Sequence, residues 1–442
     1  MSDVPSPRRA PRVLRDWLPG TPREAADAVV GNLLLHALPA HATKAALSYR
    51  ASGWLGTACA VLFGITGVTG TILLVLYIPS VERAYASVKD LETVVPFGSW
   101  LRGTHRAAAH LMVVAVVLHL VRVFLTGAYK REGPPGAARP LNWLVGLGLL
   151  LLTLGLSFTG YLLPWDQLAY WAVQVGTRIA ASVPLVGDAT REALLGGSVI
   201  GQPTLARFYA LHCFVLPSLT MALIFWHLWR IRKDGGLAVS DRVAADAVAR
   251  ARSQPPPAGR TYAILGATKG GTVASVAPSA LLVPESVASV PNAPRRAAAV
   301  ALVCLALTCV FGLAAAAPLE QAADPSRTPN PAKAPWYFLW LQELVSDLTF
   351  KLGGFVVDGT LLGGIVVPGL LVGLLAAWPW LDRSPREAAG VWFHPSRKVQ
   401  NRVFLAGLLV IAILTVVGTF CRGPYWGFVW PWDPVHTTPT RL

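Results

Sequence analysis

The sequence predicts an all-α membrane protein with about seven transmembrane helices, arranged as four helices, a linker and three further helices. Of its 442 residues, 54% are hydrophobic and only 14% are charged, which is too apolar for a soluble globular protein. A helix needs about 20 apolar residues to cross a hydrocarbon core roughly 30 Å thick. Seven runs of that length occur, near residues 53–78, 107–127, 141–163, 211–229, 298–317, 358–381 and 402–420.

The polar N-terminus and the charged loops set the expected orientation. The first 50 residues lack a small-residue cleavage site, so we expect a cytoplasmic segment with a surface helix around 24–40 rather than a secretory signal. The net charge of +15 does not predict a nucleic-acid partner, because Lys and Arg collect in loops that share one side of the membrane. This positive-inside pattern places the N-terminus in the cytoplasm.

Composition divides the chain into five segments. The long stretch after the fourth apolar run is charged and then Pro-rich, which is typical of a partly disordered linker. The expected segments are an N-terminal segment (1–50), a four-helix module (51–232), a cytoplasmic linker (233–297), a three-helix module with an outer loop at 318–357 (298–421) and a tail on the outer side (422–442).

Two of the first four spans carry paired histidines at similar intervals. His105 and His119 are 14 residues apart, so they lie about 40° apart around a helix and about 21 Å apart along it. His212 and His227 are 15 residues apart, about 60° off alignment and roughly 22 Å along the axis. Spans two and four cross in the same direction, so the first histidines share one depth and the second share another.

An imidazole from each side at matching depth is what a six-coordinate haem iron requires. We therefore predict two non-covalent b-type haems, with the iron ligands His105 and His212 at one level and His119 and His227 at the other. A single intramembrane histidine would instead be a packing residue or a proton relay. His110 is about 140° around the helix from His105 and has no counterpart on span four, so we assign it to packing or hydrogen bonding.

Glycines repeat the histidine interval on the other two spans. Gly56 and Gly70 are 14 residues apart, as are Gly146 and Gly160. A missing side chain would let a porphyrin edge approach the backbone at both depths, although helix packing also favours glycine in membranes.

Arginines flank both levels. Arg102 and Arg106 lie near the outer histidines, and Arg122 and Arg232 lie near the inner ones. We expect them to compensate the haem propionates, and snorkelling or topology signalling is the alternative. The five cysteines form no CxxC or CxxCH and are expected to be small buried hydrophobes.

Several strings carry a resemblance to a known family. SVERAYASV, TGYLLPWDQLAYWAV, RFYALHCFVLP and the helix ending in LHLVRVFLTGAYK resemble cytochrome b of the quinol–cytochrome c oxidoreductases (Rieske/cytochrome b complexes), and the match is nearest to the chloroplast-type branch. In that branch the four-helix cytochrome and its three-helix partner subunit are separate chains, whereas here they look fused. The resemblance covers roughly 45–232 and 298–421 and implies a four-helix di-haem bundle plus a three-helix C-terminal module.

The resemblance also implies a function. His105 and His212 would hold a low-potential haem near the outer face, and His119 and His227 a high-potential haem further in. The family oxidises quinol at an outer site, passes one electron to a Rieske iron–sulfur protein and sends the other through the haems to an inner quinone site, with proton translocation. Expected partners are therefore a Rieske protein, a cytochrome c-type subunit or carrier, the quinone pool and membrane lipid, in a homodimeric complex of a bacterial inner membrane.

The sequence departs from the family at two places. The outer site of the family carries Pro-Glu-Trp-Tyr, and its glutamate is assigned as a proton acceptor, but here Ala334 precedes Pro335, Trp336 and Tyr337. A carboxylate suits that task. The expected quinol-site residues are Trp336, Tyr337, the substitute Glu343 with Asp347 behind it, and Asp166 of the PWDQ string.

Glu343 lies seven residues beyond Trp336, so the two share a face if the segment is helical, and a solvated carboxylate or a salt bridge is the alternative. The second departure is Trp54, which stands where the chloroplast branch attaches an extra haem to cysteine, so we predict no covalent haem there.

Two other functions fit parts of the pattern. A di-haem, quinone-reactive membrane anchor of a dehydrogenase would use the same histidines without splitting the electrons of the quinol. A proton-coupled transporter would use the histidines as relays and would hold no haem.

Overall fold

The computed structural model describes residues 16–32, 35, 38, 41–130, 139–234 and 286–432. Residues 1–15 of the N-terminal segment, most of the expected linker and the end of the tail (433–442) lie outside the described residues. Within the described part, seven helical spans are long and apolar enough to cross a membrane. The prediction of an all-α membrane protein with seven spans is confirmed.

The first four spans are α5 (Leu55–Leu76), α7 (Gly98–Leu125), α8 (Arg139–Tyr161) and a composite of α11 (Gln202–Ala210), a π-helical turn η2 (Leu211–Val215) and α12 (Leu216–Asp234). The last three are α14 (Ser289–Ala314), the composite of α16 (Gly359–Leu361), the π-helical turn η4 (Leu362–Val366) and α17 (Val367–Leu381), and the 3₁₀ turn η6 (Pro395–Arg397) with α18 (Lys398–Phe420). Several helices begin earlier than their apolar runs, because helix ends at a membrane surface carry polar residues that a hydropathy pattern excludes.

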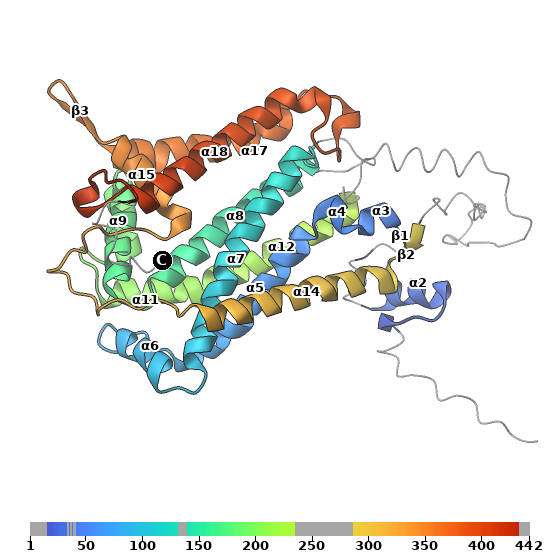
Figure 1. Ribbon diagram of the computed structural model, residues 1–442, viewed down its shortest axis with the longest axis horizontal. Coiled ribbons are helices and arrows are strands. Elements are labelled where there is room, and N and C mark those ends of the chain that lie inside the picture. The colour runs from blue at the N-terminus through green and yellow to red at the C-terminus, as the bar shows by residue number, and fades with distance from the viewer. Residues whose placement is uncertain are drawn as a thin grey trace, which may run out of the picture.

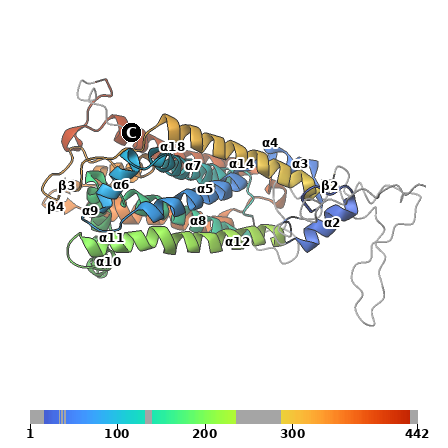
Figure 2. The ribbon, with the colours of Figure 1, turned by 90° about the horizontal axis from the view of Figure 1, so that it is seen from below.

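The first four spans form a bundle whose long helices run nearly parallel (Figures 1 and 2). Within it α5 packs on α7, α12 packs on α8, and α7 also contacts α8. A buried apolar cluster forms where α5 and α7 meet α14, around Leu62, Ala108, Met112, Ala115 and Cys304. The two histidine-bearing helices, α7 and α12, therefore belong to one bundle.

The last three spans enclose this bundle from two sides. Figure 1 shows α14 along one flank and α17 with α18 along the opposite flank. On the first flank Gly103 and Gly312 meet so closely that a Cβ on Gly103 would lie 2.6 Å from the Gly312 carbonyl oxygen. Small residues at a crossing let two membrane helices approach in this way. On the other flank α17 packs against α8.

One end of the molecule, here called the outer end in keeping with the predicted topology, holds the short connecting helices. These are α6 (Ala84–Thr93), α9 (Gln167–Ala181), α10 (Gly187–Leu195), α15 (Trp336–Asp347) and the turn η7 (Pro424–Trp426), with a hairpin of β3 (Phe350–Leu352) and β4 (Phe355–Val357). The predicted outer loop at 318–357 thus contains a helix of its own, α15, which packs on α18.

The opposite, inner end holds a small N-terminal subdomain. Its elements are α2 (Pro22–Gly31), α3 (Lys44–Leu47), α4 (Tyr49–Ser52) and strand β1 (His41–Thr43), which pairs antiparallel with β2 (Ser286–Ala288) just before α14. The hydroxyl of Thr21 caps α2 by accepting from Glu24 N, and α2 packs on α14 with Ala28 and Val29 buried. The surface helix expected around 24–40 is therefore shorter than predicted and is held against α14.

A buried ionic junction joins the two modules at the inner end. The Arg397 side chain is fully buried and donates to the carbonyl oxygens of Phe124 (2.8 Å) and Leu125 (3.0 Å) at the end of α7. It also pairs with Asp382 (3.2 Å), which accepts from the Tyr129 hydroxyl (2.7 Å). The turn η5 (Arg386–Ala388) follows Asp382 in the same connection. The junction caps α7 with a side chain from the other module.

Candidate functional site

The outer histidine pair joins α7 to the π-helical turn η2. The imidazole rings of His105 and His212 have their centroids 6.4 Å apart, with their planes at 81°. His105 Nδ1 is 2.8 Å from the Thr69 hydroxyl, and His212 Nδ1 is 3.1 Å from the Leu156 carbonyl oxygen. Neither contact was foreseen from the sequence, because Thr69 and Leu156 lie on helices that carry no histidine ligand.

These contacts fix which nitrogen of each ring is free. A carbonyl oxygen only accepts, so His212 Nδ1 must carry the proton. The Thr69 hydroxyl already donates to Ile65 O (2.7 Å), so it too accepts from His105 Nδ1. In both neutral rings Nε2 is left with a lone pair, which is the form that binds a metal.

The inner pair repeats the geometry of the outer pair. The centroids of His119 and His227 are also 6.4 Å apart, with an interplanar angle of 81°. The Nδ1 atoms of both rings are buried and make no hydrogen bond within the described part of the chain. Two facing imidazole pairs thus occur at two levels of one bundle.

The π-helical turn explains how unequal intervals produce equal pairs. A π-helical turn holds one residue more than an α-helical turn, and such turns are frequent at functional sites. Because η2 contains His212, it absorbs the extra residue of the 15-residue interval. The misalignment of about 60° expected for a regular helix is therefore wrong for this helix, and His227 returns to the register that His119 has on α7.

Each of the four predicted glycines lies against one of the four histidine rings. A Cβ on Gly70 would lie 3.1 Å from His105 Cε1, and one on Gly160 would lie 2.5 Å from His212 Cε1. The corresponding distances are 3.3 Å for Gly56 and His119 and 3.5 Å for Gly146 and His227. A Cβ at Gly70, Gly56 or Gly160 would press on the ring, so glycine preserves the ring orientation there, whereas a Cβ at Gly146 would make an ordinary van der Waals contact.

The donor set fits haem better than a simple metal ion. The described residues contain no group of three or more His, Cys, Asp or Glu side chains that could hold a metal. Two opposed imidazoles suffice only for an ion that brings its other ligands with it, as haem iron does. The 6.4 Å between ring centres accommodates two metal–imidazole bonds of about 2 Å each. The residues therefore fit a bis-histidine haem at each level.

The flanking arginines differ in how much of their charge is already paired. Arg102 pairs with Glu92 of α6 and donates to the carbonyl oxygens of Ala317 (3.0 Å) and Pro318 (2.7 Å). Arg106 is half-buried and has no hydrogen bond or ion pair among the described residues. At the inner level Arg122 is buried one turn from His119, whereas Arg232 is exposed and donates to Leu38 O (3.2 Å). Arg106 is thus the one of the four without a hydrogen bond or ion pair among the described residues, and Arg122 is the buried one.

Trp336 and Tyr337 begin α15 and face α7. Trp336 Nε1 donates to His110 Nδ1 (2.9 Å), and the ring of Tyr337 is edge-on to His110 with centroids 5.7 Å apart. Tyr337 is buried and Trp336 is partly exposed. Sequence reasoning assigned His110 to packing or hydrogen bonding, and the structure places that hydrogen bond at the predicted quinol site.

Glu343 is fully buried, and its carboxylate accepts hydrogen bonds from the side chains of Arg422 and Trp426. Arg422 Nε lies 2.8 Å from its Oε1, Arg422 Nη2 also pairs with it, and Trp426 Nε1 donates to its Oε2 (3.1 Å). Hydrogen bonding to Glu343 raises the pKa of Arg422, which also contacts Asp347 at 2.9 Å. The segment is helical, as the shared-face argument required, and the carboxylate anchors the chain after α18.

Asp166 is the buried N-cap of α9. Its carboxylate accepts from Ala169 N (2.9 Å) and from Glu320 N (3.1 Å), so it ties the first module to the chain that leaves α14. Burial raises the pKa of Asp166 and is opposed by these hydrogen bonds. All three sequence-predicted carboxylates, Glu343, Asp347 and Asp166, therefore have hydrogen-bonding partners within the protein.

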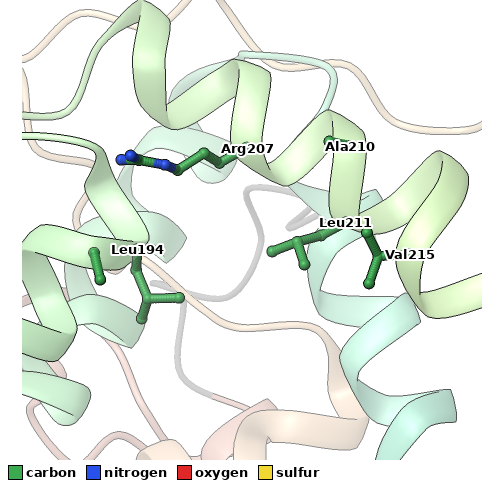
Figure 3. A pocket seen from close by; sticks show the side chains of 6 residues that line it. Leu194, Arg207, Ala210, Leu211 and Val215 are labelled. Carbon is green, nitrogen blue, oxygen red and sulfur yellow. The ribbon is translucent and has the colours of Figure 1, made fainter. Parts of the chain in front are cut away.

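A pocket of about 300 Å³ lies near the outer histidine level, at α10, α11 and η2. It is lined by Ala193, Leu194, Arg207, Ala210, Leu211 and Val215, and Figure 3 shows Arg207 as the one charged side chain among small and aliphatic ones. None of the four histidines lines it. The pocket is therefore separate from the paired imidazoles.

Comparisons with known proteins agree with this geometry. The family model described as Cytochrome b(N-terminal)/b6/petB matches residues 110–321, and the model described as Cytochrome b(C-terminal)/b6/petD matches residues 322–429. Cytochrome b6 of Synechococcus sp. (strain WH7803) is 43% identical over 181 residues, which cover 41% of this chain and 80% of that protein. Cytochrome b6 of Gloeobacter violaceus is 42% identical, over 41% of this chain and 81% of its own.

Among solved structures, a chain of a hyperthermophilic respiratory Complex III is similar in fold. The TM-score is 0.60 at 24% sequence identity, and the match covers 83% of each chain. This likeness extends over both modules, whereas the cytochrome b6 relatives match less than half of the chain.

Proposed function

The chain belongs to the cytochrome b/b6 family, and from that premise we propose that it is the di-haem subunit of a bc-type complex that oxidises quinol at its outer end. Family membership makes it an integral membrane protein of electron transport that binds b-type haem. The proposal adds that two haems are bound, that His105 with His212 and His119 with His227 are their ligands, and that the outer pair is the low-potential site.

The observation that carries the proposal is the repeated imidazole geometry. The two imidazole pairs have the same distance between ring centroids and the same interplanar angle. This holds although the two histidines of α7 are 14 residues apart and those of the fourth span are 15 residues apart. Packing alone would not require a π-helical turn that restores this register. Haem would supply one-electron transfer at each of the two levels, which are about 21 Å apart along the helices.

Some residues of the chain orient the proposed haem ligands, and others form the proposed quinol site. The backbone carbonyl of Leu156 and the Thr69 hydroxyl keep Nδ1 of the outer ligands protonated, so that Nε2 faces the site. The glycines of α5 and α8 preserve the ring orientations, and Arg106 and Arg122 supply positive charge near the two levels. Trp336 and Tyr337 form the face of α15 that meets α7, where we place quinol.

The proposal includes the partners implied by that activity. Quinol oxidation with two separate electron routes needs a Rieske iron–sulfur protein as the first acceptor and a cytochrome c-type subunit or carrier after it. The electron that enters the haems would leave at an inner quinone site, with protons released outside and taken up inside. We place the complex, as a homodimer, in a bacterial inner membrane with the N-terminus in the cytoplasm.

The ligand assignment is tested by the haem content of the purified full-length chain. The wild type should show two b haems per chain in the dithionite-reduced spectrum and by pyridine haemochrome. His119→Leu and His227→Leu should each lose the inner haem, whereas His110→Gln, a matched change of an intramembrane histidine, should retain both. Retention of both haems by the His119 or His227 variant would overturn the assignment.

Turnover separates the proposed function from its alternatives. Quinol should reduce the haems of the wild-type complex, and quinol:cytochrome reductase activity should require the Rieske protein. A haem-bearing chain without Rieske-dependent turnover would be a membrane anchor, and a chain without haem absorbance would favour a transporter.

A further inference from the structure

His110 is an imidazole in a membrane span that the haem sites do not use. It lies five residues inward of His105 on α7, which is about 7.5 Å along the helix axis and about 140° around it. The ring therefore faces α15 of the second module, where Trp336 and Tyr337 meet it. An exposed polar group at this depth is costly unless it has a binding partner.

The hydrogen bond from Trp336 fixes the tautomer of His110. An indole nitrogen is a donor only, so His110 Nδ1 must accept, and the proton of the neutral ring sits on Nε2. Nε2 makes no hydrogen bond within the part of the chain that the structure describes. The His110 residue is half-buried, so the described part of the chain does not enclose it on all sides.

The surroundings favour a neutral ligand with an oxygen acceptor and an apolar ring. Trp336 and Tyr337 lie with ring centroids 6.4 and 5.7 Å from that of His110, at interplanar angles of 38° and 75°. Arg106, one turn outward on α7, is the charged group that is electrostatically coupled to His110, and Tyr161 of α8 is in turn coupled to Arg106. Aromatic walls with one N–H donor match a quinol better than an anion or a cation.

We propose that His110 Nε2–H donates a hydrogen bond to a ring oxygen of quinol and that Trp336 is the positioning residue that holds His110 in this donor tautomer. The inference deepens the proposed function, because it assigns a substrate contact within the outer site. While Trp336 occupies Nδ1, His110 binds quinol as a donor and does not act as its base. The contact lies between the two modules and is present only when α15 packs beside α7.

The test uses the purified whole complex with decylubiquinol and, in parallel, menadiol as quinol probes. His110→Phe keeps an aromatic ring without a donor and should raise KM about tenfold, the effect of one lost hydrogen bond in an apolar site. His110→Gln places an amide donor near the position of Nε2 and should stay within about threefold of the wild type. Trp336→Phe frees Nδ1 and should raise KM by a smaller factor, about threefold. Because the role needs no change of charge, the pH profile of His110→Gln should match that of the wild type.

A control substitution and haem measurements separate the proposed contact from a general loss of structure. His394→Phe changes a partly exposed inner-end histidine that contacts Ser396, and it should leave KM unchanged. Haem content is measured in every variant, and if His110→Phe loses haem, His110→Leu takes its place. Wild-type kinetics in His110→Phe would overturn the inference. A His110→Gln variant that is as defective as His110→Phe and that loses a limb of its pH profile would also overturn it. Failure of quinol to reduce the wild-type haems would instead overturn the proposed function itself.

Discussion

At the scale of single residues, the outer end shows how a carboxylate can be present near a site and yet be committed to structure. Glu343 was the sequence candidate for a proton acceptor because of its spacing from Trp336. Its two oxygens already accept from Arg422 and Trp426, and its side chain is fully buried. A carboxylate with these partners has no free oxygen to take a quinol proton unless the anchor opens.

Glu343→Gln should therefore change stability more than chemistry. Removing one charge of a buried pair costs roughly 3 kcal/mol, so thermal unfolding of the purified complex should shift clearly downward. Asp347→Asn is the matched control, because that exposed partner of the same arginine should contribute less than about 1 kcal/mol. The pH profile of quinol turnover should be unchanged in both variants. A displaced profile in Glu343→Gln alone would return Glu343 to the proton route.

Asp382 makes the stability of the inner junction depend on pH in the acid range. Burial raises the pKa of this carboxyl, but hydrogen bonds from Ser384 and Tyr129 and the charge of Lys130 outweigh burial and lower it to about 2. Because the folded pKa is below the unfolded one, the stabilisation of about 2 kcal/mol is complete above about pH 4 and is lost as the pH falls toward 2. Thermal unfolding of Asp382→Asn should lack this acid-dependent component. An identical acid profile in the wild type and the variant would exclude it.

At the scale of elements, the π-helical turn η2 makes a prediction about register. Deleting Phe214, whose side chain is largely exposed, should let η2 relax to a regular α-helix with a 14-residue interval and retain both haems. Deleting Val114, which is also exposed, shortens the regular helix α7 and should rotate His119 by about 100° away from His227. The measurement is haem per chain by pyridine haemochrome. Loss of the inner haem from the Phe214 deletion would show that the turn does not serve register.

The elements also show which features a sequence can reveal. Histidine and glycine intervals follow from helical periodicity, so the four histidines and the four glycines could be identified within single helices, whereas the contact of each glycine with a histidine ring could not. The π-helical turn was not, because only the mismatch between intervals of 14 and 15 residues hinted at it. Contacts between segments far apart in the sequence, such as Glu343 with Arg422 or Asp166 with Glu320, depend on which helix ends meet, and the local sequence pattern does not indicate that.

At the scale of the whole molecule, the two modules contact each other directly through their membrane-spanning helices. α14 packs on α5 and α7, α17 packs on α8, and Arg397 caps the end of α7. All four proposed haem ligands lie in the first module, whereas Trp336 and Tyr337 lie in the second. The haem sites and the proposed quinol site are thus divided between the parts of the chain that the linker connects.

A protease site inserted between Ala258 and Gly259 should therefore be cleavable without separating the modules. After cleavage of the purified protein, both pieces should elute together on size exclusion with an unchanged haem spectrum. In the Gly312→Leu background, where a side chain would collide with Thr104 at the α7–α14 crossing, the same cleavage should release the second piece. The first piece should then keep its haem absorbance but lose quinol turnover, because Trp336 and Tyr337 leave with the second. Separation of the wild-type pieces would mean that the linker, rather than these helix contacts, holds the modules together.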